Sequence, residues 1–129
     1  MNRLSRENAK KILEDVPYQK AFKLHLNTSL GNLRELAEAL DVMSEQTFSH
    51  HVTKERNDFA EWISDAVGDA KLAKDVQKQI SKEKITRIIQ RRLLELEIFR
   101  FGGRMLNLID FLAGIILGIM IGVLLISLL

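Results

Sequence analysis

The 129-residue sequence has no cysteine, a single proline (Pro17) and only 6% aromatic residues. The absence of cysteine excludes disulfides, thiolate zinc sites and cysteine-ligated iron–sulfur clusters. With one proline to interrupt it, and with abundant Leu, Ala, Lys and Glu, the chain favours helices over strands. We therefore predict an all-α protein with three parts: a small helical-bundle head, a long basic helical stalk and a single C-terminal transmembrane helix.

Motifs that carry catalysis are also missing. The sequence contains no glycine-rich phosphate loop, no Ser-His-Asp order, no paired catalytic carboxylates and no dinucleotide fingerprint. Its three histidines are His25, His50 and His51. Adjacent His50 and His51 point about 100° apart on a helix and so do not form a ligand pair spaced by four residues. We expect no enzyme activity, no metal and no cofactor.

The longest apolar run lies at the C-terminal end of the sequence. From Phe111 to Leu129 no residue is charged, and Met105 begins the run a turn and a half earlier. A membrane-spanning helix needs about 20 apolar residues, and residues 105–129 reach about 37 Å at 1.5 Å per residue. The polar N-terminus indicates no signal peptide. The sequence thus predicts a tail-anchored, single-pass membrane protein.

Charge is distributed unevenly along the chain. Residues 28–69 carry nine acids against three Lys/Arg, whereas residues 70–104 carry ten Lys/Arg against four acids. Five arginines precede the apolar run: Arg87, Arg91, Arg92, Arg100 and Arg104. The positive-inside rule places the N-terminal domain in the cytoplasm, at the cell membrane. We expect these arginines to contact anionic lipid headgroups rather than nucleic acid.

One face of the predicted membrane helix repeats every four residues: Asp110, Gly114, Gly118 and Gly122. Glycines at this spacing let two helix backbones approach closely in lipid, which favours self-association into a homo-oligomer. Asp110 has three interpretations. It reaches interfacial water or pairs with Arg104 or Arg100, it hydrogen-bonds between helices of an oligomer, or it belongs to an ion path.

The sequence divides into four segments. These are an N-terminal helix (residues 1–20), the helical head (21–80), the basic amphipathic stalk (81–103) and the transmembrane helix (104–129). Ser5 is expected to cap the first helix, and Pro17 to end it. Residues 21–26 alternate apolar and polar side chains, which indicates an extended linker, although no partner strand is evident.

Capping signals divide the head further. Asn32, Ser44 and Asp69 each precede a helical pattern, as does Asn57 or Asp58, while Gly68 suits a left-handed helix end. The last of these helices is expected to continue from Ala70 to Phe99, because no Pro or Gly interrupts it. Its apolar stripe suggests a short coiled coil. Gly102 and Gly103 are then expected to break or hinge the chain before the membrane.

Sixteen residues of the head carry a resemblance to a known family: Phe22, Leu24, Leu33, Glu35, Leu36, Phe48, His51, Val52, Asn57, Asp58, Phe59, Trp62, Gly68, Asp69, Leu72 and Ala73. They match an H-V…N-D-F-x-x-W…G-D-x-x-L-A signature. On them, residues 22–72 resemble a family of uncharacterised prokaryotic domains, mainly archaeal. A departure is Asn27, where the family usually has Gly, although Asn also tolerates the left-handed conformation. The resemblance implies a compact helical domain and no specific activity.

The polar residues of that signature leave two interpretations open. His51, Asn57, Asp58 and Trp62 are either structural, as helix caps and core, or form a polar pocket or docking surface. We favour a membrane-held interaction module that recruits an unknown protein partner through its acidic head. The alternatives are an accessory subunit of a larger membrane complex and a membrane-remodelling or pore-forming oligomer.

Overall fold

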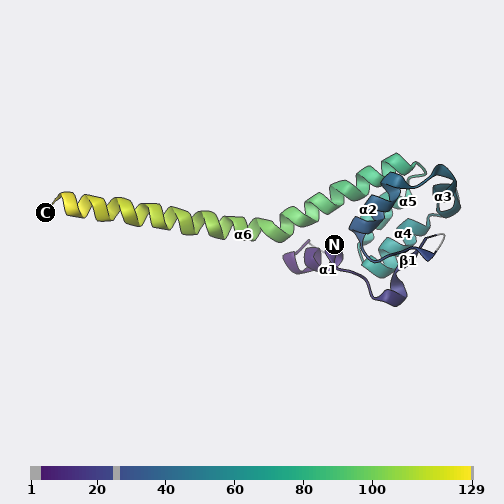
Figure 1. The fold of residues 1–129 in the computed structure, drawn as a ribbon, viewed down its shortest axis with the longest axis horizontal. Helices are drawn as coiled ribbons and strands as arrows, with labels where there is room; N and C mark the ends of the chain where they lie inside the picture. Colours follow the sequence, from purple (N-terminus) through teal and green to yellow (C-terminus); the bar gives the residue numbers. More distant parts are fainter. Residues whose placement is uncertain (1–3, 25–26, 129) are drawn as a thin grey trace.

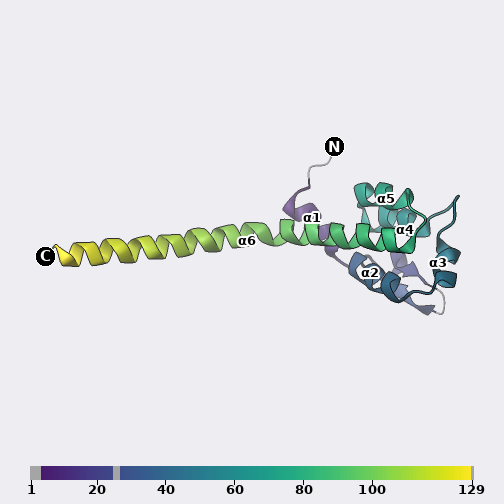
Figure 2. The same ribbon diagram turned by 90° about the horizontal axis from the view of Figure 1, so that it is seen from above.

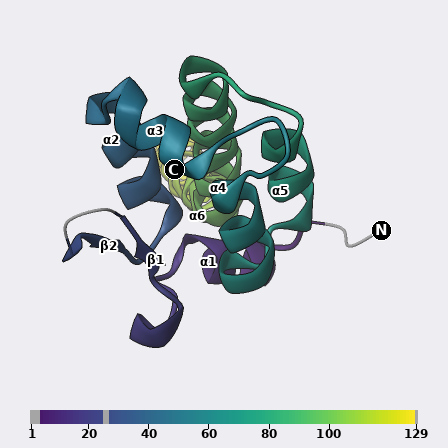
Figure 3. The same cartoon turned by 90° about the vertical axis from the view of Figure 1, so that its right-hand side faces the viewer.

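The computed structural model describes residues 4–24 and 27–128 and is mostly helical, which confirms the predicted class. The described elements are α1 (Arg6–Leu13), η1 (Tyr18–Lys20), β1 (Phe22–Lys23), β2 (Ser29–Leu30), α2 (Leu33–Val42), α3 (Glu45–His51), α4 (Asp58–Trp62), the π-helical turn η3 (Ile63–Val67), α5 (Ala70–Gln77) and α6 (Lys82–Ser127). The short elements gather around the first part of α6, and the rest of α6 extends alone (Figures 1 and 2). Seen from the head end, α6 recedes behind the helices that surround its start (Figure 3).

The predicted caps are present. Side chains of Ser5, Asn32, Ser44 and Asp69 each accept a hydrogen bond from a backbone N–H in the first turn of α1, α2, α3 and α5. For α4 the cap is Asn57 rather than Asp58. Gly68 ends η3 with φ 82°, in the left-handed region that glycine adopts without steric cost. Local capping chemistry therefore fixes where most of the short helices begin.

The linker predicted to lack a partner strand is paired. Phe22 and Lys23 lie antiparallel to Leu30 and Ser29, forming a two-residue hairpin. The turn of this hairpin contains Asn27 at φ 61°, in the left-handed region that asparagine tolerates. The extended segment was indicated by the alternation in residues 21–26, but its partner was missed because β2 has only two residues and so no alternation to detect. His25 and Leu26 lie outside the described residues.

The helix predicted to run from Ala70 to Phe99 is also wrong, because it is broken between α5 and α6. The side-chain amide of Asn57 donates to the carbonyls of Val76, at 3.1 Å, and Gln79, at 3.3 Å. Val76 lies in the last turn of α5, where its carbonyl also accepts from the backbone N–H of Gln79, and Gln79 itself lies just beyond the helix. Ser81 then caps α6 through the N–H of Lys84. A cap supplied from elsewhere in the sequence thus ends α5.

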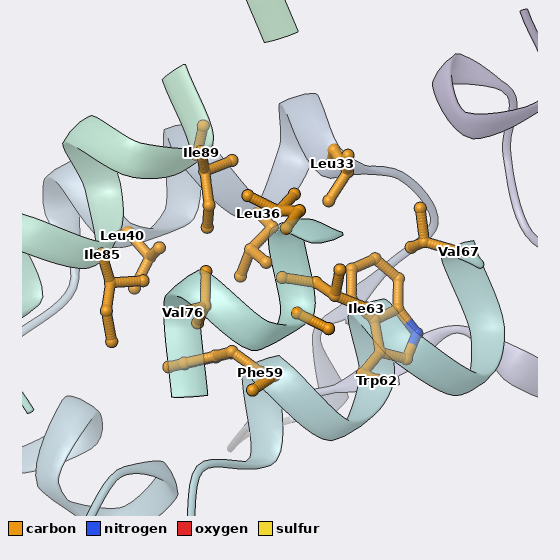
Figure 4. Close-up of a cluster of buried hydrophobic side chains, with 14 of the residues drawn as sticks. Leu33, Leu36, Leu40, Phe59, Trp62, Ile63, Val67, Val76, Ile85 and Ile89 are labelled. Carbon is orange, nitrogen blue, oxygen red and sulfur yellow. The ribbon is translucent and has the colours of Figure 1, made fainter. Parts of the chain in front are cut away.

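The first turns of α6 form the centre of the head. Ile85, Ile89 and Leu96 are fully buried. Two of them, Ile85 and Ile89, pack beside core side chains that Figure 4 labels on α2, α4, η3 and α5: Leu33, Leu36, Leu40, Phe59, Ile63 and Val76. Helices α1, α2 and α5 all contact α6. The apolar stripe assigned to a coiled coil is consequently used inside the head.

The glycine pair does not break α6. The helix is continuous through Gly102 and Gly103, so of the two predicted outcomes, a break or a hinge, the break is wrong. Figure 1 shows instead that the axis of α6 changes direction near its middle. A glycine pair is a common site of such bends, because it lacks side chains that stiffen the helix. The head and the apolar segment therefore share one helix.

Arg92 does not lie at a membrane surface, contrary to the prediction, because it is buried beside Asp69. Its Nε donates to Asp69 Oδ2 at 2.7 Å and its Nη2 to Oδ1 at 3.3 Å, while Nη1 donates to Glu95. Desolvation lowers the pKa of Arg92, but the bonds and charges of Asp69 and Glu95 outweigh it, so the pKa is raised. Asp69 also caps α5, and it is therefore not part of an exposed acidic face. This pair joins the start of α5 to α6.

Replacing Arg92 with Leu should destabilise the head by roughly 3–5 kcal/mol, because Asp69 would stay buried without its counter-charge. Thermal or urea unfolding of the full chain in detergent, followed by the fluorescence of the single tryptophan, measures this. The exposed neighbour Arg91→Leu is the matched control, expected within about 0.5 kcal/mol of the parent. Adding Asp69→Asn, which keeps the cap, should restore part of the loss. Equal stability of the Arg92 and Arg91 variants would contradict this account.

Candidate functional site

A hollow of ≈ 520 Å³ opens between the hairpin and the helix pair α4–η3. Three acids at three- and four-residue spacing, Asp58, Glu61 and Asp65, line it from α4 and η3. The remaining lining residues come from η1, β1, α3, α4 and η3: Lys20, Lys23, Phe22, His51, Trp62 and Ala66. Phe22 and Trp62 are buried and their rings lie 5.8 Å apart. The hollow thus has buried aromatic residues, with acids from one side and lysines from the other.

His51 is the most constrained polar residue of this hollow. Its side chain is 8% exposed, and Nδ1 lies 3.1 Å from Asp58 Oδ2. The second oxygen of Asp58 pairs with Arg56 Nε at 2.9 Å. Because a carboxylate only accepts, Nδ1 carries the hydrogen, and a neutral ring then has its lone pair on Nε2. Within the described part of the chain, the buried Nε2 has no hydrogen-bond partner.

The four residues singled out from the sequence divide into two groups. His51, Asp58 and Trp62 line the same hollow. The Trp62 indole N–H donates to the carbonyl of Lys20 at 2.7 Å, which holds η1 against α4. Asn57 lies apart, buried, where it caps α4 and bonds the end of α5. Asn57 is therefore a structural residue of the head.

Sequence reasoning missed the residues that complete the hollow. The spacing of Asp58, Glu61 and Asp65 on one helix was a usable signal for a shared face. Lys20 and Lys23 gave no such signal, because only the β1–β2 hairpin and the Trp62 bond bring η1 and β1 to α4. In the described residues, no three His, Asp or Glu side chains converge as a metal site.

The second candidate surface is the C-terminal part of α6. Side chains from Asn107 to Leu128 are exposed, apart from half-buried Gly122. In the described chain, α6 is the one helix that is long and apolar enough to cross a membrane. No residue of its most apolar 18-residue stretch is buried. A Cβ added at Gly114 or Gly118 would meet nothing within 4 Å. The glycine face is therefore open within a single chain.

That glycine face lies on the same side of α6 as the head. Counting 100° per residue, Asp110, Gly114 and Gly118 fall within about 50° of the mean direction of the core residues, and Gly122 lies about 90° from it. Those core residues are Ile85, Ile89, Arg92 and Leu96. The head therefore projects from the same side of α6 as the exposed Gly114 and Gly118.

The remaining arginines differ in their distance from the apolar segment. At 1.5 Å per residue, Arg104 and Arg100 lie about 10 and 16 Å before Phe111 along the helix, whereas Arg91 and Arg87 lie about 30 and 36 Å before it. The Arg100 guanidinium packs over the Phe101 ring at 4.5 Å. Arg100 and Arg104 are thus the two that adjoin the apolar segment.

Comparisons of the chain with protein-family models, with curated proteins and with solved structures found no match. The function must therefore be argued from the surfaces described above.

Replacing His51 with Leu should change stability by no more than about 1 kcal/mol, because the unpaired Nε2 already carries a desolvation cost and Asp58 keeps its bond to Arg56. Unfolding followed by Trp62 fluorescence measures the change. By contrast, Phe59→Ala, in the adjoining core, should cost roughly 3–5 kcal/mol. If His51→Leu lowered the free energy of unfolding as much as Phe59→Ala, His51 would be a residue of the core. It would then not be part of a surface available for binding.

Proposed function

We propose that this protein is a membrane-anchored interaction module, in which α6 crosses the bilayer and holds the helical head at a fixed height above it. The observation that carries this proposal is the continuity of α6 from the core of the head to the exposed apolar segment. A helix with apolar side chains exposed all round is unfavourable in water and stable in lipid. Because the head packs on the same helix, the anchor sets its orientation as well as its location.

The charge next to the anchor supports a cytoplasmic head. Arg100 and Arg104 are the cations nearest the apolar segment, and cations on that side favour retention in the cytoplasm. Each cation near an anionic bilayer surface contributes about 1 kcal/mol of attraction. Phe101, packed against Arg100, adds an aromatic ring at the same level. Arg87 and Arg91 lie farther from this surface and face the aqueous side of the head.

The head supplies the surface for a partner. Asp58, Glu61 and Asp65 stand along one wall of the hollow, above buried Trp62 and Phe22. Exposed carboxylates such as Glu61 and Asp65 suit a cationic side chain, because their charge attracts it. We infer that the head docks a partner segment carrying Arg or Lys and has no catalytic role.

The glycine face supports a second helix-packing role. Gly114, Gly118 and Gly122 allow close backbone approach by another transmembrane helix, and Asp110 at its start can accept an interhelical bond. A second copy is the partner expected from the sequence. The overhanging head, however, favours a helix without a head of its own, which is the arrangement of an accessory subunit in a larger membrane complex.

The anchor is tested by placing a charge in the apolar segment. Leu117→Arg should impair insertion, since an arginine at the centre of a span costs about 2.5–3.5 kcal/mol. The measurement is the fraction of chain that stays with membranes during alkaline carbonate extraction. The matched control is Gln77→Arg on the exposed surface of the head, which should remain membrane-bound like the parent. A parent chain fully extracted by carbonate would contradict the proposal.

The docking surface is tested by charge reversal. Glu61→Lys with Asp65→Lys should abolish recovery of partners by cross-linking in native membranes, because a cationic segment would then be repelled. Glu38→Lys with Glu55→Lys makes the same change in net charge on other exposed positions. The first pair should lose the cross-linked species and the second should keep it. Loss with both pairs, or with neither, would rule out this hollow as the docking site.

A further inference from the structure

Four large apolar side chains are exposed on α6 between the core of the head and the apolar segment: Leu94, Ile98, Phe99 and Phe101. All but Phe99 lie on one side of the helix. Leu94 and Ile98 are each 60% exposed and Phe101 is 41% exposed. They follow one another at steps of four and three residues, and the same heptad phase continues at Leu108 and Leu112. This is the spacing of the buried positions of a left-handed coiled coil. We name Leu94, Ile98 and Phe101 the outer seam.

The outer seam points away from the head. Counting 100° per residue, its mean direction is roughly 180° from that of Ile85, Ile89 and Leu96, which are buried in the head. It is also about 145° from the mean direction of the glycine face, whose last residue, Gly122, lies about 90° from the seam. Arg87 and Arg91 occupy the same side of the helix farther from the apolar segment. The seam therefore begins where these arginines end. The Arg100 guanidinium packs over the Phe101 ring, whereas Leu94 and Ile98 are largely exposed in the described chain.

We infer that the outer seam packs against the outer seam of a second copy of this chain, in a parallel coiled coil that continues into the membrane. This inference rests on the proposed anchoring, because insertion in one direction places equal residues of two copies at equal depth. Leu94 and Ile98 lie on the aqueous side of Arg100 and Arg104, so lipid does not cover them. A parallel copy does, because every heptad position then meets itself.

The position of the head makes this pairing accessible. Two chains joined at the outer seam carry their heads on opposite outer sides, whereas two chains joined at the glycine face turn their heads toward each other. The paired Arg87 and Arg91 side chains repel at the far end of the seam, which ends the coiled coil below the centre of the heads. The outer seam, proposed for self-association, and the glycine face are thus separate surfaces.

Cysteine cross-linking tests the pairing directly, because the parent chain has no cysteine of its own. Single variants Leu94→Cys and Ile98→Cys of the full chain are placed in phosphatidylcholine–phosphatidylglycerol vesicles and mildly oxidised. We expect about tenfold more disulfide-linked dimer than for Phe99→Cys, because only facing side chains bring the two sulfurs within bonding geometry. Phe99 is a matched control: it adjoins Ile98, is 48% exposed and lies about 100° around the helix.

Second-site changes distinguish this surface from the glycine face. Leu94→Lys, added to Ile98→Cys, should suppress the cross-link by charge repulsion, with Trp62 fluorescence unchanged because Leu94 is exposed. Gly114→Leu with Gly118→Leu should leave the Ile98 cross-link intact.

Each outcome decides between the two proposals. Equal cross-linking at Ile98 and Phe99, or none at Ile98 in chains that resist carbonate extraction, would overturn the seam while leaving the anchor standing. Loss of the Ile98 cross-link on glycine substitution would assign self-association to the glycine face instead. Chains that carbonate extracts would overturn the anchor itself.

Discussion

The packing of the first turns of α6 into the head is the constraint on which the rest of the structure depends. Over about 17 Å, from Ile85 to Leu96, one side of this helix is buried by α1, α2 and α5. These elements are too short to be stable alone in water, since isolated helices of fewer than about 12–15 residues are marginal. They gain their stability from α6, and the Arg92–Asp69 pair fixes the position of α5 along it.

The dual use of α6 explains the charge and hydropathy of the sequence. In the head, the helix is amphipathic, with Ile85 and Ile89 inward and Arg87 and Arg91 outward. Beyond Arg104 the charges end except for Asp110, and the surface becomes apolar all round. Because the two stretches belong to one helix, which bends but does not break near its middle, the proposed function couples the orientation of the head to that of the apolar segment. The proposed function follows from this coupling: the membrane both locates and orients the docking hollow.

Sequence reasoning succeeded where the determining interaction is local. Caps such as Ser5 and Asp69, and the left-handed turn at Gly68, depend on neighbours within four residues and were predicted correctly. It failed where the partner is distant in sequence. Arg92 was assigned to a membrane surface, although its buried partner lies 23 residues away. The end of α5 is held by Asn57, and the two-residue strand β2 gave no alternation to detect. Half of the hollow was missed for the same reason, since Lys20 and Lys23 reach it through tertiary packing.

In the proposed arrangement, the outer seam and the glycine face have different roles on different sides of α6. One side carries the head and, farther along, the open glycines; the other carries Leu94, Ile98 and Phe101. A chain with both surfaces can pair with its own copy on one side and receive another helix on the other. Neither surface competes with the hollow beside His51, which lies on the head.

The proposed function depends on one unbroken helix that joins the core of the head to a segment in the bilayer. Its most direct test is a scan of single spin-labelled cysteines from Leu94 to Leu117 in the full chain, reconstituted in lipid vesicles and read for oxygen accessibility. The account predicts a helical period of about 3.6 residues that continues through Gly102 and Gly103, with depth increasing by about 1.5 Å per residue. Loss of the period at the glycines, or water accessibility throughout the apolar segment, would contradict it.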